Sequence, residues 1–134
     1  MLFAKRHRIY IDTNFLLIPG RHKVDIFTGI ERIIPKKGEL VVFEESVREL
    51  EKIISSPTKK LADKNAAKLA ILLIKQKSLK MVGGSAKNAD ELLISCARRG
   101  DYVATQDKEL KKKLKEKGVR IIILRQETHI ALEN

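Results

Sequence analysis

The chain has a single cysteine and no tryptophan, and its apolar residues are broken into short runs. With only Cys96 present, no internal disulfide can form, and no Cys or His spacing resembles a zinc site. No apolar run approaches the roughly 20 residues that a membrane-spanning helix needs. The first residues also lack the apolar core of a signal peptide. The sequence therefore predicts a cytoplasmic protein with no membrane partner.

Aromatic residues are also scarce, at 4% of the 134 residues. Most of them fall in core-like runs, so a base-stacking platform for single-stranded nucleic acid is not evident. Acidic residues are the minority charge: 28 Lys and Arg face 17 Asp and Glu, for a formal net charge of +11. This surplus favours anionic partners, of which nucleic acid is the commonest. The alternative is a basic surface that only keeps the protein in solution.

Short β-rich runs alternate along the chain with segments of helical periodicity. The strand candidates are bounded by turn residues and span 8–12, 39–43, 78–82, 101–105 and 119–124. Apolar residues at helical spacing predict helices over 22–33, 45–55, 59–76, 89–99 and 108–117. This order predicts a single α/β domain over residues 1–134. Its expected form is a three-layer α/β/α fold whose mostly parallel sheet has about five strands.

One acid draws attention because it directly follows an apolar strand candidate. This acid is Asp12, and Glu49, Asp90 and Asp107 lie just downstream of three other strand candidates. Parallel sheets bind ligands beyond the carboxyl ends of their strands, so these four acids are expected to approach one edge of the sheet. By contrast, Asp101 begins a strand candidate at its amino end. It is expected to point away from the other acids and to form a turn.

A cluster of carboxylates repels itself and is costly unless a cation neutralises it. Mg²⁺ or Mn²⁺ fits such a cluster, because both ions prefer oxygen ligands. A bound metal can lower the pKa of a water, orient that water toward phosphorus and stabilise a departing oxygen. The four acids therefore predict a divalent metal site.

Each acid also has a structural explanation. Asp12 fits a turn cap, Glu49 a solvated helix charge and Asp107 a helix N-cap. Asp90 lies near the start of its predicted helix, where the helix dipole favours a negative charge. Glu45, one turn before Glu49, competes for the inward-facing position on the same helix. The joint placement of the acids is therefore more informative than any one of them.

Four motifs make the sequence resemble the PIN-domain ribonucleases over nearly its whole length. They are IDTNFLL (11–17), ESVRELEKI (45–53), NADELLISCA (88–97) and YVATQDKELKKKL (102–114). In order, they match the family's D-T/S-N/S motif, its Glu-Leu segment, its D-x-x-I/L helix start and its T-x-D motif. The resemblance implies that the metal-binding and catalytic acids are Asp12, Glu49, Asp90 and Asp107.

A PIN-like fold and a metal-dependent endoribonuclease are what the resemblance implies. Such an enzyme uses Mg²⁺ or Mn²⁺ and a metal-activated water to hydrolyse single-stranded RNA. Family members include rRNA-processing nucleases and the toxins of toxin–antitoxin pairs, and many form homodimers. A homodimer, an antitoxin and a ribosome-assembly partner are therefore the expected protein partners, and both branches of the family stay open.

Polar and basic residues beside the acids are the candidate substrate-binding groups. The polar ones match family positions that help to order the site, and the basic ones are placed to guide a phosphate backbone. The polar candidates are Thr13, Asn14 and Thr105, and the basic candidates are Lys108, Lys111 and Lys112. A solvated helix face is the alternative explanation for the lysines.

Other functions compete with the nuclease. A non-catalytic RNA-binding or ribosome-assembly domain on the same fold would keep the basic surface but has no need of uncompensated acids. A phosphatase with an aspartyl nucleophile normally carries a second Asp two positions later as general acid. Asn14 stands at that position. A phospho-receiver domain is disfavoured because its paired acids after the first strand are missing.

Overall fold

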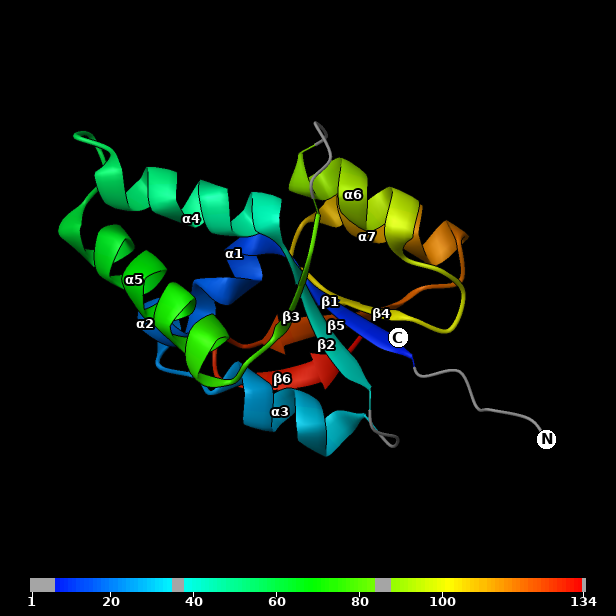
Figure 1. Cartoon of the computed structure of the whole chain (residues 1–134). Helices are drawn as coiled ribbons and strands as arrows, with labels where there is room; N and C mark the ends of the chain where they lie inside the picture. The colour runs from blue at the N-terminus through cyan, green and yellow to red at the C-terminus, as the bar shows by residue number, and fades with distance from the viewer. Residues whose placement is uncertain (1–6, 35–37, 84–87, 134) are drawn as a thin grey trace.

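Six strands form one sheet within the described residues, in the spatial order β3-β2-β1-β4-β5-β6 (Figure 1). The computed structural model describes residues 7–34, 38–83 and 88–133. Neighbouring strands run parallel except β5 and β6, which are antiparallel. The strands are β1 (Arg8–Ile11), β2 (Glu39–Phe43), β3 (Lys80–Val82), β4 (Tyr102–Ala104), β5 (Arg120–Arg125) and β6 (His129–Leu132). The predicted α/β class is confirmed, with one strand more than expected.

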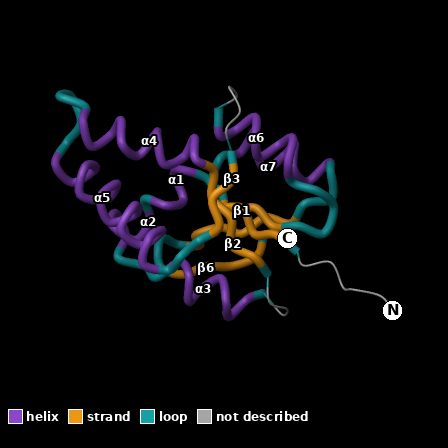
Figure 2. Tube along the Cα trace, in the orientation of Figure 1, coloured by secondary structure: helices purple, strands orange, loops and turns teal. Residues whose placement is uncertain are grey.

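Helices cover both faces of the sheet (Figure 2). The first five pack on one face and the last two on the other, which gives the three layers that the sequence predicts. They are α1 (Thr13–Leu16), α2 (Ile18–His22), α3 (Ile26–Ile33), α4 (Glu44–Ser55), α5 (Leu61–Gln76), α6 (Ala89–Cys96) and α7 (Lys108–Glu116). Within the described ranges, none of them has the length and apolar character needed to cross a bilayer.

Each face of the sheet has its own apolar core. On one face Ile11 of β1 belongs to a cluster with Phe15 and Leu50, and on the other Tyr10 belongs to a cluster with Leu114. Successive residues of a strand point to opposite faces, so β1 is buried on both and has an unbroken apolar run. A fully buried side chain of this size contributes roughly 1.5–3 kcal/mol. The two cores therefore hold both helix layers against the sheet.

The predicted helix over 22–33 was wrong at its start. The chain instead forms α2 and then α3, because Lys23 adopts a left-handed conformation (φ 55°) that ends α2. The Asp25 side chain then caps α3 by accepting hydrogen bonds from the amides of Phe27 and Thr28, both at 3.1 Å. A side-chain cap of this kind fixes where a helix begins.

The predicted helix over 89–99 was too long, since α6 ends at Cys96. After α6 the chain forms a turn that two hydrogen bonds between Asp101 and Arg98 close. The Asp101 carboxylate accepts a hydrogen bond from the Arg98 amide (2.9 Å), and the Asp101 amide donates to the Arg98 carbonyl (2.9 Å). Arg98 and Arg99 therefore lie beyond the helix and not in its last turn.

The order of the strands determines where a ligand site is expected. From β1 the chain builds β2 and β3 on one side, and then returns to build β4, β5 and β6 on the other. The direction of sheet growth thus reverses between β1 and β4, and ligands bind outside the carboxyl ends of strands at such a point. Asp12 follows the carboxyl end of β1, and Thr105 follows that of β4.

Candidate functional site

Asp12 lies buried at the point where the strand order reverses. It is only 4% exposed and precedes the first residue of α1. Its amide donates to the carbonyl of Ala104 (3.0 Å), and its Oδ2 accepts a hydrogen bond from the hydroxyl of Thr105 (2.8 Å). These two bonds fix Asp12 against the end of β4. Only the second bond reaches the Asp12 carboxylate, which burial removes from water.

Burial is the main reason why the pKa of Asp12 rises, to about 6. The hydrogen bond from Thr105 opposes this rise, while the charges of Asp90 and Asp107 add to it. Burial and the charge of Asp107 also raise the pKa of Asp90. Carboxylates affect each other in this way only when they lie close together. The carboxylates of Asp12, Asp90 and Asp107 therefore lie near enough for their charges to interact, and we call these three residues the acid cluster.

The loop after β4 holds Asp107 in a defined position. Its carboxylate caps α7 by accepting from the Leu110 amide (3.0 Å), and its amide donates to the Thr105 hydroxyl (3.2 Å). Between them, Gln106 forms two hydrogen bonds with the backbone of Leu124 on β5 (2.8 and 3.1 Å). Asp107 therefore serves as a helix cap, as one interpretation of the sequence predicts, and lies in the acid cluster as well.

Asp90 reaches the cluster from the second residue of α6. The helix begins at a side-chain cap, since Asn88 accepts a hydrogen bond from the Glu91 amide (2.9 Å). This cap places the Asp90 carboxylate at the amino-terminal end of α6, where the helix dipole favours a negative charge.

The two acidic candidates on α4 occupy different environments. Glu49 is half-buried, and no hydrogen bond or ion pair in the described part of the chain ties it to the acid cluster. Glu45 is only 6% exposed. Its Oε2 accepts a hydrogen bond from Arg48 (3.0 Å), whereas none of the described residues forms a hydrogen bond with its Oε1. Gly83 makes room for this oxygen, because a Cβ at that position would lie 2.4 Å from it.

The two polar residues that follow Asp12 have different surroundings. Thr13 is buried and donates a hydrogen bond to the hydroxyl of Ser46 (2.8 Å), which ties α1 to α4. Asn14 is exposed to solvent on α1. Thr13 therefore fixes the backbone beside Asp12, and Asn14 presents its amide to the outside.

The three lysine candidates on α7 also differ. Lys108 and Lys112 are exposed, whereas the ammonium of Lys111 lies 2.8 Å from a carboxylate oxygen of Glu133. Lys115 pairs with the other oxygen of Glu133. The hydrogen bonds from these two lysines lower the pKa of Glu133. Lys111 is thus engaged within the protein, and Lys108 and Lys112 are available at the surface.

Known proteins are similar to this chain in sequence or in fold. A family model described as a PIN like domain matches residues 9–127, a range that contains the whole acid cluster. The chain belongs to the PIN-like domain family. Ribonuclease VapC4 of Methanocaldococcus jannaschii is 36% identical over 128 residues, which cover 94% of this chain and 96% of the relative. A solved structure of the PIN domain endonuclease Utp24 has the same fold, with a TM-score of 0.72 and 22% identity over 94% of this chain and 90% of that one.

The acid cluster of this PIN-like domain has the chemistry that a divalent cation requires. Its donors are carboxylate oxygens, which Mg²⁺ and Mn²⁺ prefer. In the described ranges, no Lys or Arg nitrogen comes within 4.0 Å of any of the three carboxylates. Among the described residues, no group of three or more His, Cys, Asp or Glu side chains is placed so that it could hold a metal ion. The acid cluster thus fits a cation by the type and charge of its donors and not by their arrangement in this structure.

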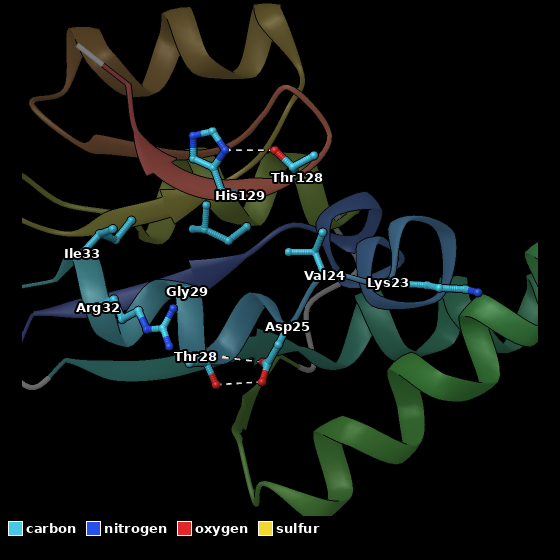
Figure 3. A pocket seen from close by; sticks show the side chains of 10 residues that line it. Lys23, Val24, Asp25, Thr28, Gly29, Arg32, Ile33, Thr128 and His129 are labelled. Carbon is cyan, nitrogen blue, oxygen red and sulfur yellow. Dashed lines mark hydrogen bonds between the residues drawn. The ribbon is translucent and has the colours of Figure 1, made fainter.

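A separate cavity of about 530 Å³ lies between α3 and the start of β6 (Figure 3). Apolar side chains such as Val24 and Ile33 line part of it. Its one carboxylate, that of Asp25, already accepts hydrogen bonds from the Thr28 amide (3.1 Å) and the Thr28 hydroxyl (2.7 Å). These bonds lower the pKa of Asp25. Hydrogen bonds thus stabilise the ionised form of Asp25, whereas burial raises the pKa of Asp12 and of Asp90.

Proposed function

We propose that this PIN-like domain is a cytoplasmic endoribonuclease that depends on Mg²⁺ or Mn²⁺ and hydrolyses phosphodiester bonds of single-stranded RNA. The observation that carries the proposal is Asp12. It is a buried carboxylate whose pKa burial and the neighbouring acids raise to about 6, and no basic group in the described residues lies within 4.0 Å of it. Support also comes from the relative that is named a ribonuclease and from the structural neighbour that is named an endonuclease.

The acids would hold the cation, and the polar residues around them would position the acids. Asp12, Asp90 and Asp107 are proposed as ligands, and Glu49 is proposed as a fourth acid that approaches from α4. Thr105 acts as a positioning residue, because its hydroxyl contacts both Asp12 and the Asp107 amide. When bound, a divalent cation supplies a water of lowered pKa and positive charge near the departing oxygen.

RNA would approach this edge through the exposed residues beside the cluster. Lys108 and Lys112 offer positive charge to phosphates, and Asn14 and the Thr13 backbone lie next to Asp12. Contacts of this kind hold the backbone without selecting a sequence. Lys111 was also predicted to contact substrate, and it can do so only if it leaves Glu133. A homodimer, and either an antitoxin or a ribosome-assembly protein, are the partners proposed on the family resemblance.

Cleavage of an unstructured RNA in the presence of Mn²⁺ tests the proposal. Asp12→Asn should lower the rate at least about 10²–10³-fold, the loss expected when one preorganised electrostatic group is removed, and a chelator should abolish cleavage in the wild type. The matched control is Asp101→Asn, which makes the same substitution at the other edge of the sheet and should still cleave. Full activity in Asp12→Asn would contradict the mechanism.

Calorimetric titration with Mn²⁺ separates the enzyme from the non-catalytic alternative. The enzyme should bind Mn²⁺ at millimolar concentration or below, and Asp12→Asn should bind it more weakly. A chain that binds RNA but neither binds Mn²⁺ nor cleaves would instead be an RNA-binding or ribosome-assembly domain on the same fold.

A further inference from the structure

A cavity of about 630 Å³ opens at the amino-terminal edge of the sheet, which is the edge opposite the acid cluster. It is lined by the starts of β1 and β2 and by the turn between α6 and β4. We call it the amino-edge cavity. Arg8 begins β1 and Asp12 follows its end, so about 13 Å of strand separates the two regions at about 3.3 Å per residue. The amino-edge cavity is therefore not part of the site described above.

Both acids that line the amino-edge cavity already have partners within the protein. The two carboxylate oxygens of Asp101 accept hydrogen bonds from the backbone amides of Arg8 (3.0 Å) and Arg98 (2.9 Å). Glu39 lies 3.5 Å from the Arg8 guanidinium and 3.8 Å from the Lys80 ammonium. Neither acid needs an added cation, and neither is available to neutralise a further arginine.

Two arginines in the same lining have no such partner. Arg98 and Arg99 are exposed, and within the described part of the chain no carboxylate oxygen lies within 4.0 Å of either guanidinium. Cations without a paired acid at the mouth of a concave site attract anions, because their electric fields add up in the cavity.

The backbone holds these arginines in place. Gly100 has φ +91°, and the turn that it completes is closed by the hydrogen bonds between Asp101 and Arg98. The Arg99 side chain lies over Gly118, where a Cβ would come within 3.2–3.4 Å of its Cγ, Nε and Cζ. Both arginines thus belong to a hydrogen-bonded turn, and the Arg99 side chain also packs on the backbone of Gly118.

We propose that the amino-edge cavity binds a phosphate group through Arg98 and Arg99. A guanidinium presents paired N–H donors that match two phosphate oxygens, and charge-assisted bonds of this kind are about twice as strong as neutral ones. The volume leaves space for the nucleoside that carries the phosphate. A free nucleotide and an RNA segment remote from the scissile bond are the two sources of such a phosphate. The RNA source rests on the proposed function, and the free nucleotide does not.

Binding of inorganic phosphate and of AMP to the full chain tests the cavity itself. Calorimetry on the wild type should show binding of both, and Arg98→Ala/Arg99→Ala should weaken it at least about tenfold because two groups that form charge-assisted bonds are removed. The matched control is Lys59→Ala/Lys60→Ala, which removes the same charge from an exposed segment between α4 and α5. Circular dichroism checks that both variants are folded.

A charge-conserving variant separates a specific site from general attraction. Arg98→Lys/Arg99→Lys keeps two positive charges but loses the planar fork, so its phosphate affinity should fall between those of the wild type and the alanine variant. An affinity equal to that of the wild type would show that only net charge matters, and it would overturn the proposed geometry. So would an equal loss of affinity in the Lys59→Ala/Lys60→Ala control.

Single-stranded oligouridine in the presence of EDTA tests the RNA source without cleavage. For single strands, log affinity falls with log salt by about 0.7 per neutralised phosphate. Arg98→Ala/Arg99→Ala should therefore reduce that slope by about 0.7 for each phosphate that the variant no longer neutralises, and the lysine control should leave it nearly unchanged. An unchanged slope with intact AMP binding identifies a nucleotide site, and the proposal of a phosphate site then stands without RNA.

Two results would overturn the phosphate proposal. One is the absence of phosphate and AMP binding to the wild type. The other is tighter binding of a glutamate-rich peptide than of AMP, which would assign the cavity to an acidic protein segment. Neither result depends on Asp12, so the outcome is separate from that of the cleavage test. If Asp12→Asn still cleaves RNA while AMP binding requires the arginines, only the proposed function fails.

Discussion

Asp12 and Asp101 lie at opposite edges of the same sheet, and the protein treats them in opposite ways. Each carboxylate oxygen of Asp101 accepts a hydrogen bond from a backbone amide, which is typical of a residue that organises a turn. Asp12 is buried, accepts one side-chain hydrogen bond, and lies near two more acids that raise its pKa. The same side chain is therefore hydrogen-bonded on both oxygens at one edge and lies beside further negative charge at the other.

The difference shows how structural and functional acids can be told apart. A carboxylate that stabilises the fold has its donors within the protein, so it needs nothing from solution. A carboxylate that is buried beside others destabilises the fold until a proton or a cation arrives. An acid of the second kind is retained despite its cost in stability, which is typical of residues that bind or react.

The largest expected effect is on the free energy of unfolding. Replacing Asp12 or Asp101 by asparagine should change it in opposite directions. In metal-free buffer at pH 7, Asp12→Asn should stabilise the protein by about 3 kcal/mol. The pKa of Asp12 is raised from 3.8 to about 6, and each pKa unit corresponds to about 1.4 kcal/mol. Asp101→Asn should destabilise it by about 1–2 kcal/mol, since one charge-assisted acceptor is removed. Urea unfolding of both variants measures the two effects.

The pH dependence of the free energy of unfolding tests the interpretation of Asp12. Because the pKa of Asp12 is higher in the folded chain, its contribution to stability is fully present below pH 3.8 and is lost as the pH rises through about 6. The raised pKa of Asp90 acts in the same direction, and the lowered pKa values of Asp25 and Glu133 act in the other. Because both proteins contain these three groups, the difference in stability between wild type and Asp12→Asn reports Asp12. A difference that stays constant from pH 4 to pH 7 would contradict the buried carboxylate.

A divalent cation should reverse the penalty at the acid cluster. Mn²⁺ at a concentration one hundred times its dissociation constant should raise the free energy of unfolding of the wild type by about 2.7 kcal/mol. Asp101→Asn should respond equally, and Asp12→Asn much less. Thermal unfolding with and without Mn²⁺ measures this. Equal stabilisation of all three proteins would place the cation elsewhere.

Removing the hydroxyl of Thr105 should have a smaller effect. Thr105→Val keeps the shape but loses the donor to Asp12 and the acceptor for the Asp107 amide. We expect a loss of about 1–3 kcal/mol in stability, a further rise in the pKa of Asp12, and about 10–100-fold slower cleavage. Thr105→Ser keeps the hydroxyl and is the control. An NMR titration of the Asp12 carboxyl reports the pKa independently of activity.

The smallest expected effects distinguish two lysines of α7. Lys111→Ala breaks the pair with Glu133 and should cost up to about 1 kcal/mol in stability, with little change in RNA affinity. Lys108→Ala should leave stability nearly unchanged and lower the salt dependence of single-strand binding by about 0.7. The reverse pattern would mean that Lys111 leaves Glu133 when RNA binds. Urea unfolding and binding at several salt concentrations separate the two cases.

Much of this arrangement could be predicted because buried parallel strands have a simple sequence pattern. Their apolar runs identify five strands, and the rule about carboxyl ends places Asp12 beside residues from distant segments. The predicted placement of Asp101 in a turn is also confirmed. By contrast, the charges that raise the pKa of Asp12 depend on how α6 and α7 pack, and no local pattern gives that distance.

Two features could not be predicted from the sequence, for local reasons. The turn before β6 places Gln126 and Glu127 at positive φ (54° and 59°), which are conformations usually signalled by Gly or Asn. No such residue marks this turn, so β6 was not predicted. On α4, Glu45 and Glu49 lie one turn apart and share a face. Periodicity does not decide between them, whereas the structure buries Glu45 (6% exposed) and leaves Glu49 half-buried.

The late position of β6 has a consequence for synthesis on the ribosome. Among the described strands, β6 pairs with β5 alone, and all the proposed site acids precede it in the chain. A nascent chain that has emerged as far as β5 therefore contains all of those acids while one edge of its sheet still lacks its covering strand. An uncovered edge is a template for pairing with another chain. Until β6 emerges, the β5 edge is therefore open to pairing with another chain.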